Sequence, residues 1–566
     1  MCNGLNINNN ESNINETSNF IHKIVEEDIE NNAYTRDICT RFPPEPNGYL
    51  HIGSVYAINF SYTVAEKYNG LFNLRFDDTN PLKEDEEYVK AIIEDMEWMG
   101  FSPKERIFYG SDYSEKIFQY AIELIKKGKA YVCDLTPDEI REYRGTLTEA
   151  GKDSPYRNRS MEENLALFNS MRNGEFPNSS KVLRAKIDMS SPNINMRDPV
   201  IYRILHASHY RTGNDWCIYP MYDFAHPLQD AIEGVTHSLC SIEFNNHRPL
   251  YEWFLNELNI KEPPKQREFG RINLTGVVTS KRYLKELVFG NYVDGWDDPR
   301  LPTIKGLRRR GFTKESIKNF VNEIGVSRTQ TIVHISMLDN CLREDLKSKV
   351  NSVMAVLNPL KVTITNFPEN EVEDLTIENN SGNSTLGSRV VPFTREIYIE
   401  KDDFMEEPIK GFKRLTLKGE VRLKGAYFIK CNEIIRDPET GEIIELLCTY
   451  DPETKSGSGF TGRKVKGTIH WVSATKSINA TVNLFEEFLK DEEALKDPSK
   501  TWPERINPNS LMTLSNCILE PSIKDAVSED KFQFIRHGYF VVDNKHSTSD
   551  NLIFNRIVPL KDSWKK

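Results

Sequence analysis

The sequence lacks any apolar run that approaches the ~18 residues needed to cross a membrane. Its first stretch, MCNGLNINNNESNINETSNF, has neither the basic segment nor the apolar segment of an export signal. The nine cysteines are scattered, without CxxC pairs or histidines at zinc spacing, so neither a zinc knuckle nor a disulfide framework is indicated. We therefore expect a cytoplasmic chain with reduced thiols, no metal site and no membrane contact.

The composition favours several ordinary globular domains. The chain has 566 residues, of which 38% are hydrophobic and 28% charged. A formal net charge of −11 argues against a general coating of nucleic acid. A local basic face can still bind phosphates, because electrostatic fields decay over ~8–10 Å at physiological salt. The asparagine-rich tail 1–19 is too polar to bury a core, and we expect it to be disordered.

From about residue 34 to residue 350, strand patterns alternate with helix patterns. AYTRDICTRF and LFNLRF each read as a strand, and HIGSVYAINFSYTVAEKY between them has helical spacing. Asn80 and Pro81 predict a cap and first turn of the next helix. That helix should present one apolar stripe, made of Val89, Ile92, Ile93, Met96 and Met99. We expect a βαβ unit that opens a parallel, doubly wound sheet.

After about residue 350 the pattern changes to antiparallel strands. EIYIEKDDF, KRLTLKGEVRLKGAYFIKC and KVKGTIHWVSA alternate apolar and polar residues, and RDPETGEI is a turn between two such runs. ENNSGNSTLGS and TKSGSGFTG read as loops. This half of the chain is expected to form β-barrels.

The stretch RFPPEPNGYLHIG, residues 41–53, combines features that suit a nucleotide. Its prolines stiffen the turn after the first strand, and Gly48 and Gly53 allow a ligand to approach the backbone. The following helix presents N–H groups and a positive dipole end, which favour the phosphates of ATP. His51 can add a donor to a phosphate oxygen, although a single histidine near a helix start is more often structural. The combination, not His51 alone, indicates the site.

This stretch and others along the chain together resemble class I glutaminyl-tRNA synthetases. The matching segments are RFDDTNP, YPMYDF, DAIEGVTHSLCSIEF, VVTSKRYL, GWDDPRLPTIKGLRRRG, EVRLKGAYFIK, GRKVKGTIHWVSA and FNRIVPLKDSW. The resemblance extends from about residue 20 to the end and is more specific than any single motif.

The resemblance implies an α/β fold with a class I Rossmann-type catalytic domain, an acceptor-stem-binding insertion, a helical subdomain and two antiparallel β-barrels that bind the anticodon. The expected boundaries are 20–110 with 205–270 for the Rossmann domain, 111–204 for the insertion, 271–350 for the helical subdomain, 351–390 with 480–566 for the proximal barrel, and 391–479 for the distal barrel. The implied reaction joins glutamine to ATP with Mg²⁺, forming glutaminyl adenylate, and then transfers glutamine to tRNA(Gln). A monomer is expected.

The attack of a carboxylate on the α-phosphate needs positioning and charge stabilisation more than a base. By resemblance, His51 and Lys281 are the catalytic residues that meet the phosphates. The implied ATP-binding set is Glu45, Pro46, Asn47, His51, Gly53, Ser54, Ser241, Arg271, Ile272, Thr279, Ser280 and Lys281. For glutamine, Asp77 is expected to bind the α-ammonium and Tyr222 the side-chain amide, because a neutral amide needs hydrogen bonds rather than a cation. Arg41, Gln266 and Cys240 complete the implied pocket.

The sequence departs from the family pattern on both sides of the expected ATP site. Ser54 replaces the second histidine of the first signature, Val55 and Tyr56 replace the small and basic residues that usually follow it, and Thr279 replaces the methionine of the second signature.

For tRNA, the family pattern matches at Lys413, Arg414, Gln533 and Arg536. It departs at Asn246, where an aspartate is expected, at Ser352, where an arginine is expected, and at Gly411, where a glutamine is expected. Single-stranded bases are read by stacking and edge hydrogen bonds, so loss of an arginine should weaken selection of one base.

Three interpretations stay open at this point. The first is a working glutamine–tRNA ligase with a variant site. The second is a diverged paralogue, either a tRNA-binding or regulatory protein with weak or no activation, or an enzyme for an unusual tRNA. The third is a glutamyl-tRNA synthetase, which YPMYDF and PPEPNGYLHIG disfavour.

Overall fold

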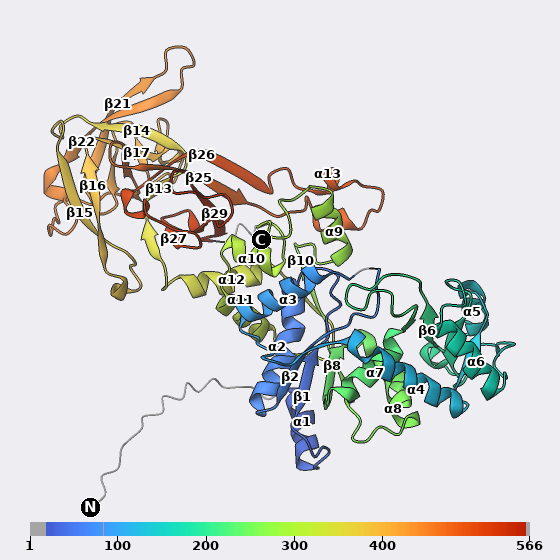
Figure 1. Ribbon diagram of the computed structural model, residues 1–566. Helices are drawn as coiled ribbons and strands as arrows, with labels where there is room; N and C mark the ends of the chain where they lie inside the picture. The colour runs from blue at the N-terminus through green and yellow to red at the C-terminus, as the bar shows by residue number, and fades with distance from the viewer. Residues whose placement is uncertain (1–18, 83, 562–566) are drawn as a thin grey trace, which may run out of the picture. The chain divides into compact units, whose positions relative to one another are not determined.

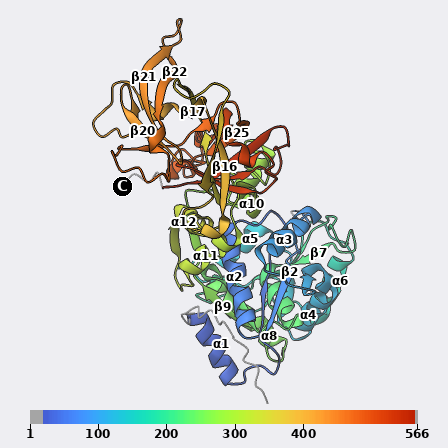
Figure 2. The same cartoon turned by 90° about the vertical axis from the view of Figure 1, so that its left-hand side faces the viewer.

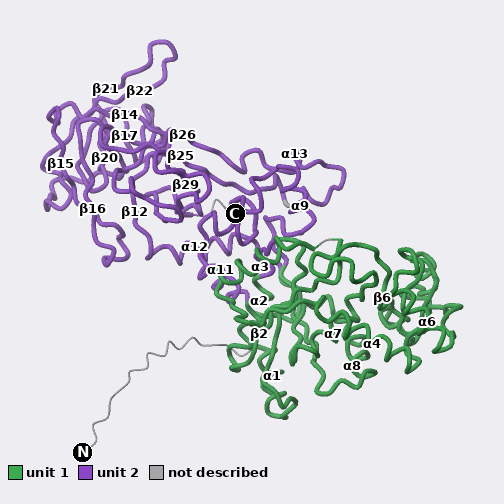
Figure 3. Tube along the Cα trace, in the orientation of Figure 1, with its two compact units in different colours: residues 1–48, 55–272, 325–331 green, residues 49–54, 273–324, 332–566 purple. Residues whose placement is uncertain are grey.

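The computed structural model describes residues 19–82 and 84–561. These residues divide into two compact units (Figure 3): unit 1 contains residues up to 48, 55–272 and 325–331, and unit 2 contains 49–54, 273–324 and the chain from 332 onward. The tail predicted to be disordered lies outside the described residues except for Asn19. The Asn19 side chain caps helix α1 (Phe20–Glu30) by accepting from the Ile21 and His22 N–H groups.

The centre of unit 1 is the predicted parallel sheet (Figure 1). Strands β1 (Cys39–Phe42), β2 (Leu71–Phe76) and β3 (Ile107–Tyr109) run parallel, with α2 (Ile52–Lys67) between the first two. Strands β8 (His237–Ser241) and β9 (Lys265–Phe269) form a second parallel pair. The Thr236 N–H donates to the Cys39 carbonyl (2.9 Å), which places β8 beside β1. The βαβ prediction is confirmed.

The predicted start of the next helix is wrong. Helix α3 (Glu86–Met99) begins after Asp85, whose side chain accepts from the Glu87 N–H (2.8 Å), while Asn80 and Pro81 lie in the preceding turn. An aspartate accepts this bond as well as an asparagine, so the acidic run after Pro81 offered a competing cap. Of the predicted stripe, all but the half-buried Ile93 are buried.

A four-stranded antiparallel sheet forms the insertion in unit 1. Its strands are β4 (Ala130–Cys133), β5 (Val182–Ala185), β6 (Val200–Ile204) and β7 (Ile218–Pro220). Because β7 pairs with β6, the insertion continues past the predicted boundary at residue 204. The other helices of unit 1 are α4 (Ser114–Lys126), α5 (Pro137–Arg144), α6 (Met161–Arg172), α7 (Tyr222–Ile232) and α8 (Arg248–Glu257), and its 3-10 turns are η1 (Gly110–Tyr113), η2 (Ile194–Met196) and η3 (Ile242–His247).

The helical part of unit 2 packs partly on a segment from far along the chain. Buried Val278, Leu284 and Leu287 pack with Phe488 and Trp502, so residues 486–510 leave the barrel region to cover this helix. The elements here are β10 (Ile272–Thr275), α9 (Lys281–Phe289), α10 (Ile304–Arg310), α11 (Lys314–Ile324), β11 (Thr331–His334), α12 (Ser336–Leu346), η7 (Glu492–Leu495) and α13 (Trp502–Arg505).

Two seven-stranded sheets contain most of the remaining strands of unit 2. The first has the order β12 (Asn351–Val353), β27 (Lys531–Phe534), β28 (Gly538–Val542), β29 (Leu552–Pro559), β25 (Ile478–Phe485), β26 (Leu511–Leu519) and β13 (Ala355–Val356). The second has the order β23 (Thr468–Ile469), β20 (Glu420–Leu423), β21 (Phe428–Arg436), β22 (Ile443–Asp451), β14 (Pro359–Ile364), β17 (Glu396–Glu400) and β24 (Val472–Ser473). The predicted turn RDPETGEI joins β21 to β22 in a hairpin that projects from its sheet (Figure 2).

The predicted boundary between the two barrels is wrong. Strand β14 pairs with β17 and β22, so residues 359–364 belong to the second sheet and not to the segment 351–390 of the first. Leu375 and Phe393, from the hairpin β15 (Val372–Glu378) and β16 (Ser388–Thr394), are buried in the core of the second sheet. Pairing is also partly parallel, as in β14 with β22 and β25 with β29. The two short strands β18 (Phe404–Met405) and β19 (Leu415–Thr416) form a further parallel pair.

Candidate functional site

Arg41, at the end of β1, is buried and held by several groups of unit 1. Its Nη1 donates to the Leu239 carbonyl (2.7 Å), its Nη2 to the Ser238 hydroxyl (2.6 Å), and its Nε to Asp230 (3.1 Å). Burial alone would raise the pKa of Asp230, but Arg41, His226 and Arg75 hold it far below its ordinary value. Asp230 therefore stays ionised and holds both arginines in place.

Tyr222 begins α7 and lies in the same neighbourhood as Arg41. Its ring stacks on His226 at 4.9 Å between centroids and lies 5.4 Å from Phe244. Burial raises the pKa of Tyr222 well above its ordinary value, Arg41 opposes this, and Cys240 and Asp77 add to it. These electrostatic couplings connect the predicted residues Tyr222, Arg41, Asp77 and Cys240. The phenol is protonated at neutral pH and can donate a hydrogen bond to an amide oxygen.

Asp77 follows β2 and is 5% exposed. Its backbone N–H donates to the Pro44 carbonyl (3.0 Å), which ties it to the loop after β1. Burial raises the pKa of Asp77 to about 6, against the lowering effect of Arg75. A carboxylate with this pKa is ionised at neutral pH and can bind an ammonium group.

Gln266 on β9 is buried beside these residues. Its Nε2 donates to the Phe244 carbonyl (3.1 Å) and to Glu268 (2.9 Å), so the amide nitrogen is committed to the protein. Burial raises the pKa of Cys240 to about 12, so its thiol stays protonated. His226 and Asp230, one helical turn apart on α7, were not predicted. Their spacing in YDFAHPLQD was the available signal.

The other predicted nucleotide residues of unit 1 form two small groups. In the loop after β1, the Asn47 side chain donates to Glu45, and the Pro46 carbonyl accepts from the Asp85 N–H (3.1 Å). Farther along the chain, Glu243 accepts from Arg271 (2.5 Å) and from the Ser241 hydroxyl (3.4 Å). Ile272 beside Arg271 is buried. Glu243 was missed because an exposed glutamate in SIEF has no distinguishing pattern.

The first signature, residues 49–54, belongs to unit 2. The Ile52 N–H donates to the Pro302 carbonyl (3.0 Å), and the Leu50 carbonyl accepts from the Ile304 N–H (3.0 Å). Gly53 donates its N–H to His51 Nδ1 (3.1 Å), so a neutral His51 carries its proton on Nε2. A Cβ on Gly53 would lie 2.9 Å from His51 Cε1. Glycine here lets the imidazole fold over the first turn of α2 with Nε2 as a donor.

Ser54 is half-buried, and its N–H donates to the His51 carbonyl (2.8 Å).

The second signature precedes α9 in unit 2. Ser280 is the exposed N-cap residue of α9, and its carbonyl accepts from the Leu284 N–H (2.9 Å). Within the described part of the chain its side chain makes no capping bond, which leaves the first N–H groups of α9 for a ligand. Thr279 and Lys281 flank it and are half-buried. This is an arrangement suited to phosphate oxygens.

The predicted tRNA-binding residues of unit 2 lie near a buried carboxylate, Asp403, or in the wall of a cleft. Arg414 and Arg536 both pair with buried Asp403, at 3.3 Å and 2.6 Å. Gln533 accepts from the Ser352 hydroxyl (2.5 Å), and both line a cleft of about 430 Å³ together with Arg536. Lys413 is exposed beside Arg414. Asp403 was not predicted, because the run EKDDFMEE contains several acidic residues with no pattern that selects one.

The backbone of the structure bears on two of the departures from the family pattern, Gly411 and Asn246. Gly411 is exposed with φ +94, a conformation that favours glycine over glutamine. Asn246, in unit 1, is also exposed, and its carbonyl accepts from Asn193 (2.8 Å) and Asn195 (3.2 Å). The backbone of Asn246 is therefore held by two neighbouring asparagines, and its side-chain amide is exposed.

Comparisons with known proteins cover nearly the whole chain. The family described as tRNA synthetases class I (E and Q) matches with its catalytic domain at residues 37–348 and with its anticodon-binding domain at 351–451 and 468–543. A glutamine–tRNA ligase of Clostridium perfringens is 58% identical over 98% of this chain and 100% of its own length. Those of Clostridioides difficile and Pseudomonas putida are 56% and 52% identical, over 98% and 97% of this chain and 99% and 96% of their own lengths. No helix in the described ranges could span a membrane.

Proposed function

We propose that this chain, which belongs to the class I tRNA synthetases (E and Q), is a glutamine–tRNA ligase. The roles of its residues are proposed as follows. The enzyme uses ATP to activate glutamine and transfers it to the 3′ end of tRNA(Gln). The observation that carries the proposal is full-length identity above 50% to relatives named glutamine–tRNA ligase. It disfavours the diverged paralogue and the glutamyl-tRNA synthetase left open by the sequence.

The pocket of unit 1 supports glutamine as the substrate. Tyr222 offers a protonated phenol to the side-chain amide, and Asp77 offers a buried carboxylate to the α-ammonium. Arg41 is bound to Asp230, Ser238 and the Leu239 carbonyl, so its main part is to hold the wall of the pocket.

The two signatures of unit 2 support the assignment of ATP contacts. His51 Nε2 and the first N–H groups of α9, with Lys281, are donors for phosphate oxygens that gain charge in the transition state. Mg²⁺ enters with ATP as part of the substrate and supplies charge neutralisation of its phosphates. The rest of the nucleotide is proposed to contact Glu45, Pro46, Asn47, Ser241, Arg271 and Ile272.

For tRNA, we propose that Lys413, Arg414, Gln533 and Arg536 contact the anticodon and Asn246 the acceptor stem. Support comes from the anticodon-binding family match over residues 351–451 and 468–543. We further propose a monomeric enzyme in the cytoplasm, where the tRNA is charged.

The test is ATP–pyrophosphate exchange with purified protein, with glutamine or glutamate, and with or without tRNA(Gln). Exchange with glutamine that requires tRNA is the expected result. Exchange with glutamate alone would identify a glutamyl enzyme, and tRNA binding without exchange would identify a paralogue that has lost activation.

A further inference from the structure

Asp403, at the end of η5 (Lys401–Asp403), is a fully buried carboxylate in unit 2. Arg536 donates to it with both ends of the guanidinium, Nη1 to Oδ2 and Nη2 to Oδ1, each at 2.6 Å. Arg414 approaches the same carboxylate, with its Nε 3.3 Å from Oδ1. A bidentate bond of this kind fixes the plane of the guanidinium as well as its position.

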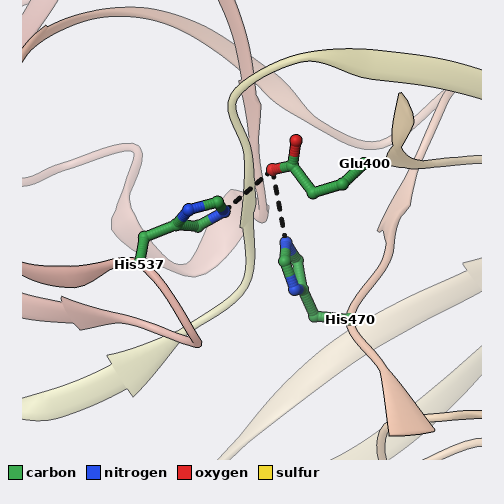
Figure 4. Close-up of side chains that lie close together, drawn as sticks. All are labelled: Glu400, His470 and His537. Carbon is green, nitrogen blue, oxygen red and sulfur yellow. Dashed lines mark hydrogen bonds and ion pairs between the residues drawn. The ribbon is translucent and has the colours of Figure 1, made fainter. Parts of the chain in front are cut away.

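A buried histidine holds Arg536 from a second side. Arg536 Nη1 lies 3.5 Å from His470 Nδ1, while Glu400 Oε1 lies 3.5 Å from His470 Nε2 and 2.8 Å from His537 Nε2 (Figure 4). The Leu357 and Asn358 N–H groups donate to Glu400 at 2.7 and 3.0 Å and keep it in place. Because the carboxylate faces Nε2, the proton of a neutral His470 lies there, and the Nδ1 lone pair faces Arg536.

Glu400, His470 and His537 are of the residue types that bind metal ions, and one ligand atom from each lies within 4.8 Å of the others. Histidine bound to a metal through Nε2 keeps its proton on Nδ1 and donates it to an acceptor. Here Nδ1 faces a guanidinium, which has no acceptor. The surroundings of His470 therefore do not fit a metal ion bound through Nε2.

The backbone conformation of Arg536 is unfavourable. Its φ is +71, a conformation that costs free energy for any residue with a Cβ. The side chain nevertheless lies in the wall of the cleft that also contains Ser352 and Gln533. Contacts with Asp403 and His470 are thus what define its direction.

We propose that Asp403 is a positioning residue for tRNA recognition, whose carboxylate orients Arg536, and with it Arg414, before tRNA arrives. The inference rests on the proposed function, in which these two arginines contact the anticodon. Orienting a flexible arginine in advance lowers the entropy lost on binding, so the gain is expressed in tRNA affinity and not in the chemical step.

Asp403→Asn keeps the shape and removes the charge. We expect the KM for tRNA to rise about tenfold, equivalent to about 1.4 kcal/mol, with kcat at saturating tRNA and the KM values for ATP and glutamine within twofold of wild type. Asp402→Asn is the matched control: it makes the same charge change at the adjacent, exposed residue and should leave the KM for tRNA unchanged.

Arg536→Ala separates this inference from the proposed function. No effect of Arg536→Ala on tRNA affinity would remove Arg536 from the proposed anticodon contacts. A tRNA defect in Arg536→Ala without one in Asp403→Asn would overturn the positioning role, as would full additivity of the two changes in the double variant. If Asp403→Asn does not fold, Arg536→Lys carries the test: it keeps the charge and loses the bidentate bond, so an unchanged KM for tRNA would count against the proposal.

Discussion

Gly53→Ala is the most direct test of how the first signature is built. The added Cβ would lie 2.9 Å from His51 Cε1 and 3.0 Å from Nδ1, closer than carbon atoms in proteins approach. The imidazole must turn away, and the Gly53 N–H bond to Nδ1 that selects the Nε2 proton is lost. If His51 is a transition-state donor to a phosphate, its misplacement should slow adenylate formation by about 10²-fold, or about 2.7 kcal/mol.

The assay is single-turnover adenylate formation at saturating ATP, glutamine and tRNA. Gly53 lies in the first turn of α2, where alanine is intrinsically favoured by up to about 1 kcal/mol, so the melting temperature should not fall in parallel with the rate. His51→Ala is the reference variant, since it removes the ring that Gly53→Ala is expected to displace.

Two results would refute this reasoning. One is a Gly53→Ala rate within twofold of wild type. The other is an equal loss when Gly53→Ala is added to His51→Ala, because a variant without the imidazole has nothing left to displace.

Three further predictions concern the two proposed glutamine contacts, Tyr222 and Asp77, and the first signature. Tyr222→Phe should raise the KM for glutamine by about tenfold, because an unpaired amide costs ~1–3 kcal/mol, and an unchanged KM would remove the assigned contact. The burial that raises the pKa of Asp77 to about 6 favours the neutral acid, so kcat/KM for glutamine should fall as pH drops below about 6, and a flat profile from pH 7 to 5 would exclude Asp77 as the ammonium partner. The raised pKa also makes the fold less stable at higher pH. Below the unfolded pKa of about 4, Asp77 does not lower the free energy of unfolding; the lowering develops as pH rises from about 4 through about 6. Ser54→His should raise the rate of adenylate formation about tenfold, most visibly together with Thr279→Met, and an equal or slower rate would show that Ser54 is no deficit.

Several patterns that are local in the chain were predicted correctly. The strands at residues 39–42 and 71–76, the helix between them and the turn of RDPETGEI depend on alternation, helical spacing and turn residues within a few positions. The signature stretches likewise identified the family before any contact was known, because their residue types and order were enough. The roles assigned to their individual side chains remain predictions.

Contacts between distant segments were decided only by the tertiary structure. The boundary between the barrels was misplaced because β14 can pair equally well, by its own pattern, with either sheet, and its partners β17 and β22 lie far along the chain. The cap of α3 was misplaced because Asn80 and Asp85 are both good caps by residue type. In the structure it is Asp85 that caps the helix, and the Asp85 N–H bonds to the Pro46 carbonyl (3.1 Å) of an earlier loop. Asp403 shows the same limit in the candidate site: among several acidic neighbours, only the fold shows which one is buried against Arg536. Sequence specifies which local structures are favourable, whereas burial and charge pairing across the chain select among them.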